Sequence, residues 1–325
     1  MVLGNGTVLR GLISATISAD CYLGANRFYV QSAIEADPGL DWTALPLTID
    51  VQAILGGTAS RLIYGEADSL HYDPISRILC VEGRDLTARF LGKQTQITYQ
   101  NQTSEEIATS IAAAHGLTAN VAKTTAVVGR YFSDNHTRSA LYQYAKATSD
   151  WDILIWIAQQ EGFDVWVEDT TLNFQPPQAD GPSFVVTPAD CTNMSLVRDN
   201  TIAGGIDAHV QSWNCQAGES IASNVGGGPT DNSIAMMQLV KPNLQAAQAD
   251  QIAQQAVTVM TQHGKQLYYS MPADVTTKPR ILMQLVGTDS VFDDIYKICS
   301  VERRFSVDGG YVQHVEAKVA QWINS

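Results

Sequence analysis

Two acidic residues of this chain have the types and the local setting that glycoside cleavage requires. Glu161 ends an apolar helical stretch, and Asp169-Thr170 follows in the next hairpin. Cleavage of a glycosidic bond uses two carboxyl groups placed across that bond. Helix ends and hairpin turns also favour these residue types without any reaction, and we prefer this structural interpretation. The pair therefore defines one alternative function, a cell-wall hydrolase, beside a purely structural interpretation.

Two Asp-Ser pairs near opposite ends of the chain have the residue types of a reactive dyad. They are Asp68-Ser69 and Asp289-Ser290. Short Asp and Ser side chains also hydrogen-bond to the backbone of their own turns. Because both pairs occur in similar surroundings, we interpret them as turns between apolar strands.

The other residue types that carry chemistry lack the spacing they would need. Residues 226–230 are glycine-rich but are not followed by the Lys-Ser or Lys-Thr of a phosphate-binding loop. The histidines are isolated, and no cysteine stands in a nucleophile motif. The five cysteines form no CxxC pair, which favours a reduced compartment. We predict no enzyme activity and no cofactor, and no catalytic, cofactor-binding or metal-ligating residue.

The charge balance limits the possible partners. The chain has 33 acidic and 20 basic residues and a net charge of −13. Such a surface repels phosphate backbones, so sequence-independent nucleic-acid binding is disfavoured, although nucleic acid can pass without binding. The longest apolar stretch, residues 151–158, is too short for a membrane span. No secretory signal precedes it, and we expect no membrane insertion.

Alternation of apolar and polar residues predicts strands near both ends of the chain. Residues 1–95 and 178–325 are predicted to be β, and residues 96–177 to be an α+β insert between them. The predicted strands cover residues 28–34, 47–51, 61–64, 77–82, 194–197, 205–213, 280–286, 296–301, 304–307 and 311–319.

Capping residues predict where the helices begin and end. Thr103 with Glu106 has the pattern of a capping box, and Gly116 follows the helix that it opens. A broadly apolar helix is predicted from Ser149-Asp150 to Gly162, followed by a hairpin. Further helices are predicted at residues 139–147 and, capped by Asn243, at 243–264, and residues 218–232 are predicted to be a flexible loop.

Two distant stretches have nearly the same order of residues. Asp68, Cys80 and Glu82 are followed, at nearly equal separations, by Asp289, Cys299 and Glu302. A similarity at so long a spacing indicates two copies of one folding unit rather than a solenoid. Cys80 and Cys299 are then expected in matching strands, as small core residues. Arg84, Arg303 and Arg304 are expected to pair with Glu82 and Glu302 or with a neighbouring subunit.

The ordered set of segments resembles the baseplate hub family of phage tails. This family includes late-control tail proteins and the hub half of type VI secretion spike proteins. The segments that carry the resemblance are residues 81–86, 103–108, 115–117, 149–154, 157–158, 162–167, 172–174, 287–290, 296–301 and 309–311.

The resemblance implies a β-rich α+β fold, with two similar tube-like antiparallel β-barrel domains and an α+β insert domain between them. It implies a homotrimeric ring of pseudo-six-fold symmetry that joins a hexameric tail tube, or a distal tail protein, to a trimeric central spike. Baseplate wedge components would surround the ring, and DNA would pass through its lumen without specific binding. Such a protein is a structural component of the virion's tail baseplate and assembles in the host cytoplasm. No needle-forming repeat follows, so the spike is expected to be a separate protein.

Two other functions stay open. A tail-associated cell-wall hydrolase would need Glu161 and Asp169 to converge in a cleft. A stand-alone binding module would be a monomer in solution.

Overall fold

A computed structural model describes most of the chain. The described residues are 2–3, 8, 11–34, 46–55, 58–95, 97, 99, 102–125, 127–128, 148–177, 180–203, 205–214, 218–227, 235–241 and 244–320. The predicted helix at 139–147 and the predicted cap Asn243 lie outside them.

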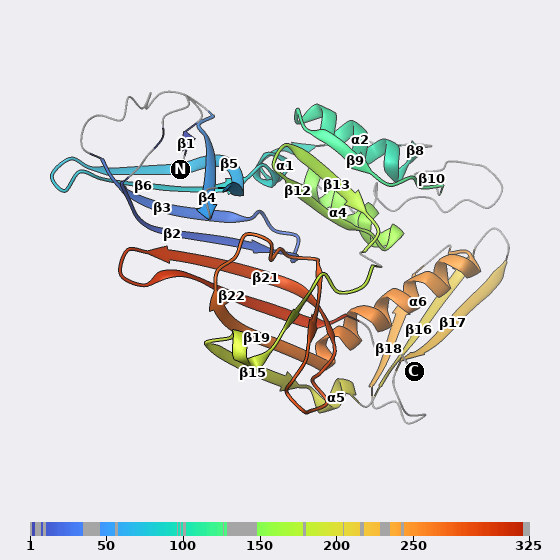
Figure 1. Cartoon of the computed structure of the whole chain (residues 1–325). Coiled ribbons are helices and arrows are strands. Elements are labelled where there is room, and N and C mark those ends of the chain that lie inside the picture. Colours follow the sequence, from blue (N-terminus) through green and yellow to red (C-terminus); the bar gives the residue numbers. More distant parts are fainter. Residues whose placement is uncertain are drawn as a thin grey trace.

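The main element is a 12-stranded sheet that contains strands from both ends of the chain (Figure 1). Its first half consists of β1 (Val2–Leu3), β2 (Gly11–Asp20), β3 (Arg27–Ala33), β4 (Thr48–Leu55), β5 (Thr58–Asp73) and β6 (Ile78–Asp85). Its second half consists of β14 (Phe184–Val186), β15 (Asn193–Arg198), β19 (Lys265–Pro272), β20 (Leu282–Leu285), β21 (Ile295–Ser306) and β22 (Gly310–Val319).

The two halves have the same strand order. In the first half the neighbours run β4-β5-β6-β3-β2, and in the second they run β20-β21-β22-β19-β15, with every neighbouring pair antiparallel. Each strand of one series occupies the same place in chain order as its counterpart. The β-rich α+β class is therefore confirmed. The boundaries at residues 95 and 177, and the closure of each half into a barrel, stay predictions.

Strand alternation gives each half of the sheet one apolar face and one polar face. In β6, Leu79 and Val81 are buried, whereas Glu82 is exposed. The apolar faces form two separate cores. The first gathers residues of β2 to β6 around Phe28 and Val30, and the second gathers residues of β15 and β19 to β22 around Leu267 and Tyr296.

The halves join where β2 pairs with β21, as the adjacent ribbons in Figure 1 show. β20 covers only the start of β21, pairing with Ile295 to Lys297, and β2 pairs with the rest, from Ser300 to Ser306. Two strands, β20 and then β2, therefore pair with successive parts of the same edge of β21.

The insert contains α1 (Thr87–Leu91), α2 (Ser104–Ala114), α4 (Asp150–Glu161), β9 (Thr118–Val121), β12 (Asp164–Glu168) and β13 (Thr171–Gln175). Short pairs complete it: β7 (Gln94–Thr95) with β11 (Thr148–Ser149), and β8 (Gln102–Thr103) with β10 (Val127–Val128). Both predicted helix starts are confirmed, because Thr103 and Ser149 each cap their helix within a capping box. The hairpin β12–β13 is also confirmed.

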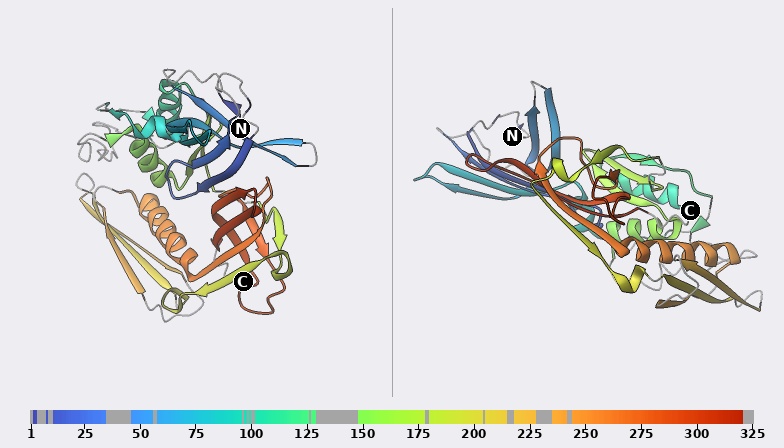
Figure 2. Two further views of the ribbon diagram at one scale, coloured as in Figure 1. Left: turned by 90° about the vertical axis from the view of Figure 1, so that its left-hand side faces the viewer. Right: turned by 60° about the horizontal axis from the view of Figure 1, so that its bottom comes forward.

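A third unit interrupts the second half of the sheet. It consists of β16 (Ile206–Asn214), β17 (Glu219–Gly227), β18 (Ala235–Val240) and α6 (Ala246–Thr261). α5 (Asn200–Ala203) and the short 3-10 helices Pro188–Asp190 and Gln262–Gly264 flank these elements. Both α-containing units lie toward the same end of the sheet (Figures 1 and 2).

Three predictions about these elements were wrong. The flexible loop predicted at 218–232 contains strand β17, because Ile221 and Val225 alternate along it and pack against α6. The long helix begins at Ala246 with Gln245 as its cap. Asp68 lies inside the long strand β5, at a bulge between Ala67 and Ser69, and not in a turn.

Candidate assembly surface

The polar faces of the two halves form one surface, which we call the polar sheet face. It is made by the residues of β2, β3, β6, β15, β19 and β22, and of β5 and β21 beyond their bulges, that alternate with the buried ones. Acidic and basic side chains are mixed on it, with a small excess of acids. The acids are Asp20, Asp68, Asp73, Glu82, Glu302 and Glu316, and the bases are Arg27, Arg84, Arg304 and Lys318, the last of which is itself buried.

The strand registers show that the halves repeat the same residues on this face. Tyr29 of β3 lies opposite Glu82 of β6, and Tyr268 of β19 lies opposite Glu316 of β22. Two residues beyond each Glu stands a base, Arg84 or Lys318. The segment 81–84, Val-Glu-Gly-Arg, therefore corresponds in position to the segment 315–318, Val-Glu-Ala-Lys.

The bulges repeat as well. The pairing of β5 with β6 skips Asp68, and the pairing of β21 with β22 skips Cys299. The residues after these bulges, Ser69 and Ser300, lie opposite Glu82 and Glu316. A bulge twists its strand and changes which side chains face the core. The two halves therefore bend at equivalent places.

These registers correct the predicted alignment of the repeat. Cys80 lies in β6 and Cys299 in β21, which occupy different positions in their halves. Glu82 corresponds to Glu316 and not to Glu302. The duplication holds at the level of strand order, but the residues first matched are displaced by one strand. Cys299 is buried, whereas Cys80 lies on the polar sheet face and accepts a hydrogen bond from Tyr29.

Several charges on the polar sheet face are paired within the chain. Arg84 donates two hydrogen bonds to Asp68, at 2.6 and 2.8 Å, and Arg304 pairs with Glu302. Arg303 points the other way and is buried, donating to the carbonyl oxygens of Asp274 and Thr277. An acid and a base that are paired largely cancel each other's electrostatic potential, so these pairs contribute less to the potential of the surface than isolated charges would.

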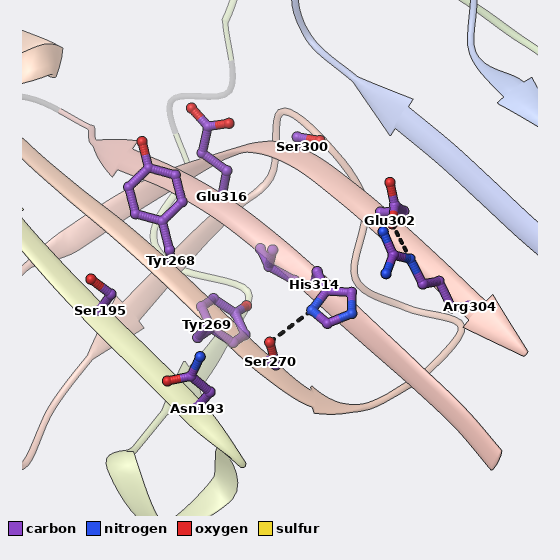
Figure 3. A pocket seen from close by; sticks show the side chains of 11 residues that line it. Asn193, Ser195, Tyr268, Tyr269, Ser270, Ser300, Glu302, Arg304, His314 and Glu316 are labelled. Atoms are coloured by element: carbon purple, nitrogen blue, oxygen red, sulfur yellow. Dashed lines mark hydrogen bonds and ion pairs between the residues drawn. The ribbon is translucent and has the colours of Figure 1, made fainter. Parts of the chain in front are cut away.

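The second half carries a hollow of about 410 Å³ on this face (Figure 3). Tyr268, Glu302, His314 and Glu316 line it, and Ser270 lies 2.8 Å from Nδ1 of His314. At its margin the hydroxyl of Tyr22 donates to Glu316 at 2.5 Å. Burial and this hydrogen bond raise the pKa of the Tyr22 phenol. The hollow offers hydroxyl, carboxylate and imidazole groups spread over a sheet, without a buried nucleophile.

Each half ends in a hairpin whose tip bears an exposed aliphatic side chain. Ile75, between β5 and β6, is 93% exposed, and Val307, between β21 and β22, is 69% exposed. The two tips point to the same side of the molecule (Figure 1). The two halves therefore carry one exposed aliphatic residue each at corresponding hairpin tips.

The structure separates the two candidate catalytic carboxylates. Glu161 ends α4, where it accepts a hydrogen bond from Ser104 at 2.6 Å, and Asp169 lies in the turn after β12. The five residues of β12 stand between them. At a rise of about 3.3 Å per residue, β12 alone spans roughly 13 Å, whereas glycosidase carboxyl groups are about 5–9.5 Å apart. The two residues therefore do not form such a pair.

Asp169 instead borders a cavity of about 750 Å³ where the insert meets both halves of the sheet. It pairs with Arg61 of β5 at 3.3 Å, and two further acids of the insert pair across to the second half. These pairs are Glu168 with Lys278, at 2.5 Å, and Asp164 with Lys297, at 2.8 Å. These ion pairs therefore link the insert to both halves of the main sheet.

Two further observations concern the predicted sites. His115 is not isolated in space, since its Nε2 lies 2.7 Å from Asp150 in the core of the insert. Asp289 and Ser290 lie in the loop between β20 and β21, where Ser290 accepts a hydrogen bond from the backbone N–H of Phe292. In the described part of the chain, no three His, Cys, Asp or Glu side chains gather to hold a metal ion. No helix there has the length and apolar character to cross a membrane.

A family described as the Alg8 N-terminal domain matches residues 68–199, a span that begins inside β5 and ends just after β15. This span is less than half of the chain. No curated protein matches the sequence.

Solved structures match nearly the whole chain. A tail protein from Neisseria meningitidis is 15% identical with a TM-score of 0.70, and the match covers 95% of this chain and 92% of that one. The 43 kDa tail protein of a Shewanella oneidensis prophage is 15% identical with a TM-score of 0.67, covering 97% and 96%. An Escherichia coli component of the type VI secretion system is 11% identical with a TM-score of 0.59, covering 94% and 73%.

These likenesses extend over both halves of the sheet and the two α-containing units. The chain therefore has the fold of phage tail proteins and of type VI secretion components, consistent with the baseplate hub family that its sequence resembles.

Proposed function

We propose that three copies of this chain form the hub ring of a tail baseplate, in a phage or a phage-like particle. Each copy contributes two similar sheet modules, so that three chains present six similar units. The ring thereby adapts a hexameric tail tube, or a distal tail protein, to a trimeric central spike. Its role is structural, and its location is the virion tail, assembled in the host cytoplasm.

The single observation that carries this proposal is the repeated register. Both halves have the same strand order, the same bulge, and the same Tyr-Glu-base arrangement on one face. A closed ring of three chains, each with two equivalent surfaces, would present six such surfaces and so imitate six-fold symmetry.

The hairpin tips supply a contact that fits a six-fold partner. Ile75 and Val307 occupy corresponding tips on one side of the chain, so a ring of three chains would present six aliphatic tips on one rim. The tail tube is the partner with matching symmetry. The opposite side, where the α-containing units lie, would face the baseplate wedge components.

The polar sheet face is suited to line a conduit. Its bases are interspersed with acids, and it is not basic. DNA binds proteins largely through uncompensated Lys and Arg, so a face of this kind would let DNA pass without retaining it. This support would be lost if the polar sheet face lay on the outside of the ring.

A map of the assembled particle tests the proposal directly. We expect threefold symmetry at the position of this chain, with the polar sheet face toward the axis. A single copy per particle, or a position off the axis, would contradict the ring. The hydrolase alternative is tested separately by incubating the protein with peptidoglycan. Release of sugars by the wild type but not by Glu161→Gln would support that alternative, and we expect none from either.

A further inference from the structure

Among the strands of the main sheet that have an edge without a neighbouring strand in the described residues are β15 and the second part of β5. β15 pairs with β19 alone, so its other edge carries no strand. β5 pairs with β4 only from Thr58 to Glu66, and beyond its bulge it pairs with β6 alone. Uncovered strand edges offer backbone groups for pairing with another chain.

The counterparts of these two edges pair with each other inside the chain. β15 corresponds to β2, and β5 beyond its bulge corresponds to β21 beyond Cys299. β2 pairs antiparallel with β21 over this stretch, with Ala19 opposite Val301 and Ser18 opposite Glu302. The β2–β21 pairing is thus a completed junction inside the chain. The strands equivalent to its two sides, β15 and the second part of β5, are both present elsewhere in the sheet without a partner on that edge.

The burial of the side chains shows the same difference. Those next to the uncovered edges are only half-buried: Leu70, Met194 and Leu196. Their counterparts in the completed junction are buried at 0%, 7% and 2% exposure: Val301, Ala15 and Ile17. The half-buried side chains also pack against the same two cores as the rest of the sheet. A strand added at either edge would complete these cores.

We propose that β15 of one chain pairs with β5 of a second copy, repeating the β2–β21 junction between subunits. This inference rests on the proposed ring and specifies its subunit contact. Transfer of the internal register places Arg198 opposite Leu70, Val197 opposite His71 and Ser195 opposite Asp73 of the neighbour. The main sheet then continues from chain to chain until the third copy closes on the first.

The transferred register sets no acid opposite an acid and no base opposite a base among these residues. Its one charged residue on the apolar side is Arg198, which is exposed at the end of β15. Leu196 and Leu70 fall on the apolar side, in line with the cores of their own halves. A register shifted by one residue would turn Leu196 to the polar sheet face, which the burial pattern opposes.

Cross-linking of the full chain tests the register. Val197 and His71 are both exposed, so the substitutions Val197→Cys and His71→Cys leave the cores intact. Cys80 lies opposite His71 within the same chain and must first be replaced, by Cys80→Ser, in every variant. On oxidation we expect covalent species of two and three chains and nothing larger, since a closed ring of three leaves no free edge. Thermal melting under reducing conditions checks that each variant is folded.

The matched control moves one cysteine by two residues on the same face. The pair Val197→Cys with Ser69→Cys should cross-link less by on the order of tenfold, because diagonal positions are too far apart for a disulfide. The mass in solution, measured in parallel by light scattering, separates the two levels of the argument. A trimer without cross-linking at His71, or with stronger cross-linking at Ser69, would overturn this strand pairing while leaving the ring. A monomer that never cross-links would contradict both.

Discussion

Removing one buried charge should stabilise this protein at neutral pH. Asp85 ends β6 on the apolar side of the sheet and is only 4% exposed. Burial raises the pKa of its carboxyl group to about 6, and hydrogen bonds from Thr87 and Asn26 offset this only in part. One of these bonds joins the backbone N–H of Thr87 to Oδ1 at 3.1 Å. Asp85→Asn keeps an acceptor oxygen at this position and removes the charge.

The magnitude follows from the displacement of the pKa. The folded pKa of about 6 exceeds the ordinary value of 3.8 by about two units, which corresponds to about 3 kcal/mol. Because the folded state holds the proton more tightly, the stabilisation from protonated Asp85 is complete below pH 4 and is lost as the pH rises through 6. Above pH 6 the ionised, buried carboxylate lowers the free energy of unfolding of the wild type.

Urea unfolding of both proteins between pH 4 and pH 8 measures this effect. We expect the variant to be similar to the wild type at pH 4 and more stable by up to about 3 kcal/mol at pH 8. Asp73→Asn is the matched control, because that exposed carboxylate accepts hydrogen bonds from Ser76 and Ile75, which lower its pKa. Asp73→Asn should change the free energy of unfolding in the opposite direction, lowering it at neutral pH. A difference between Asp85→Asn and the wild type that does not change with pH would refute the reasoning.

Three further substitutions test the packing. Thr103→Ala removes the cap of α2 and should cost about 1 kcal/mol in urea unfolding, whereas Thr103→Ser should cost little. Gly83→Ala places a methyl group 2.1 Å from the carbonyl oxygen of Glu66 and 2.5 Å from the Phe28 ring. The free energy of unfolding should therefore fall by about 1–3 kcal/mol, and the melting temperature should fall with it. An unchanged melting temperature would show that the strands can separate there. Phe174→Ala empties a fully buried site in the insert and should cost about 3–5 kcal/mol, and a loss below 1 kcal/mol would mean that the core collapses into the space.

The elements that could be predicted from the sequence are those defined by local signals. The starts of α2 and α4 depend on residues three apart, Thr103 with Glu106 and Ser149 with Asp152, and both capping boxes are present in the structure. Gly162 adopts the left-handed conformation, with φ of 71°, that ends α4. Such signals require no knowledge of what packs against the helix.

Elements that depend on distant partners could not be predicted in this way. β17 contains polar residues and two glycines at its end, which are typical of a loop, yet it pairs along its length with β16 and packs against α6. The carboxylates of Glu161 and Asp169 illustrate the same limit. Their closeness in sequence suggested a pair, but a strand stands between them, and each is engaged by a different neighbour, Ser104 or Arg61.

The repeat shows why residue identity alone gave the wrong alignment of two correctly recognised copies. Matching Cys80 and Glu82 to Cys299 and Glu302 compares β6 with β21, two strands that occupy different positions in their halves. It also crosses the bulge at Cys299, where β21 gains a residue without a partner in β22, so Cys80 on the polar sheet face is matched with a buried cysteine. The register instead relates Glu82 to Glu316, each opposite a tyrosine, and these are positions on one shared face. In a duplicated sheet, strand pairing therefore determines which positions of the two halves correspond and can contact a symmetric partner in the same way. Corresponding positions carry similar residues, such as Arg84 and Lys318, whereas the identical residues Cys80 and Cys299 do not correspond.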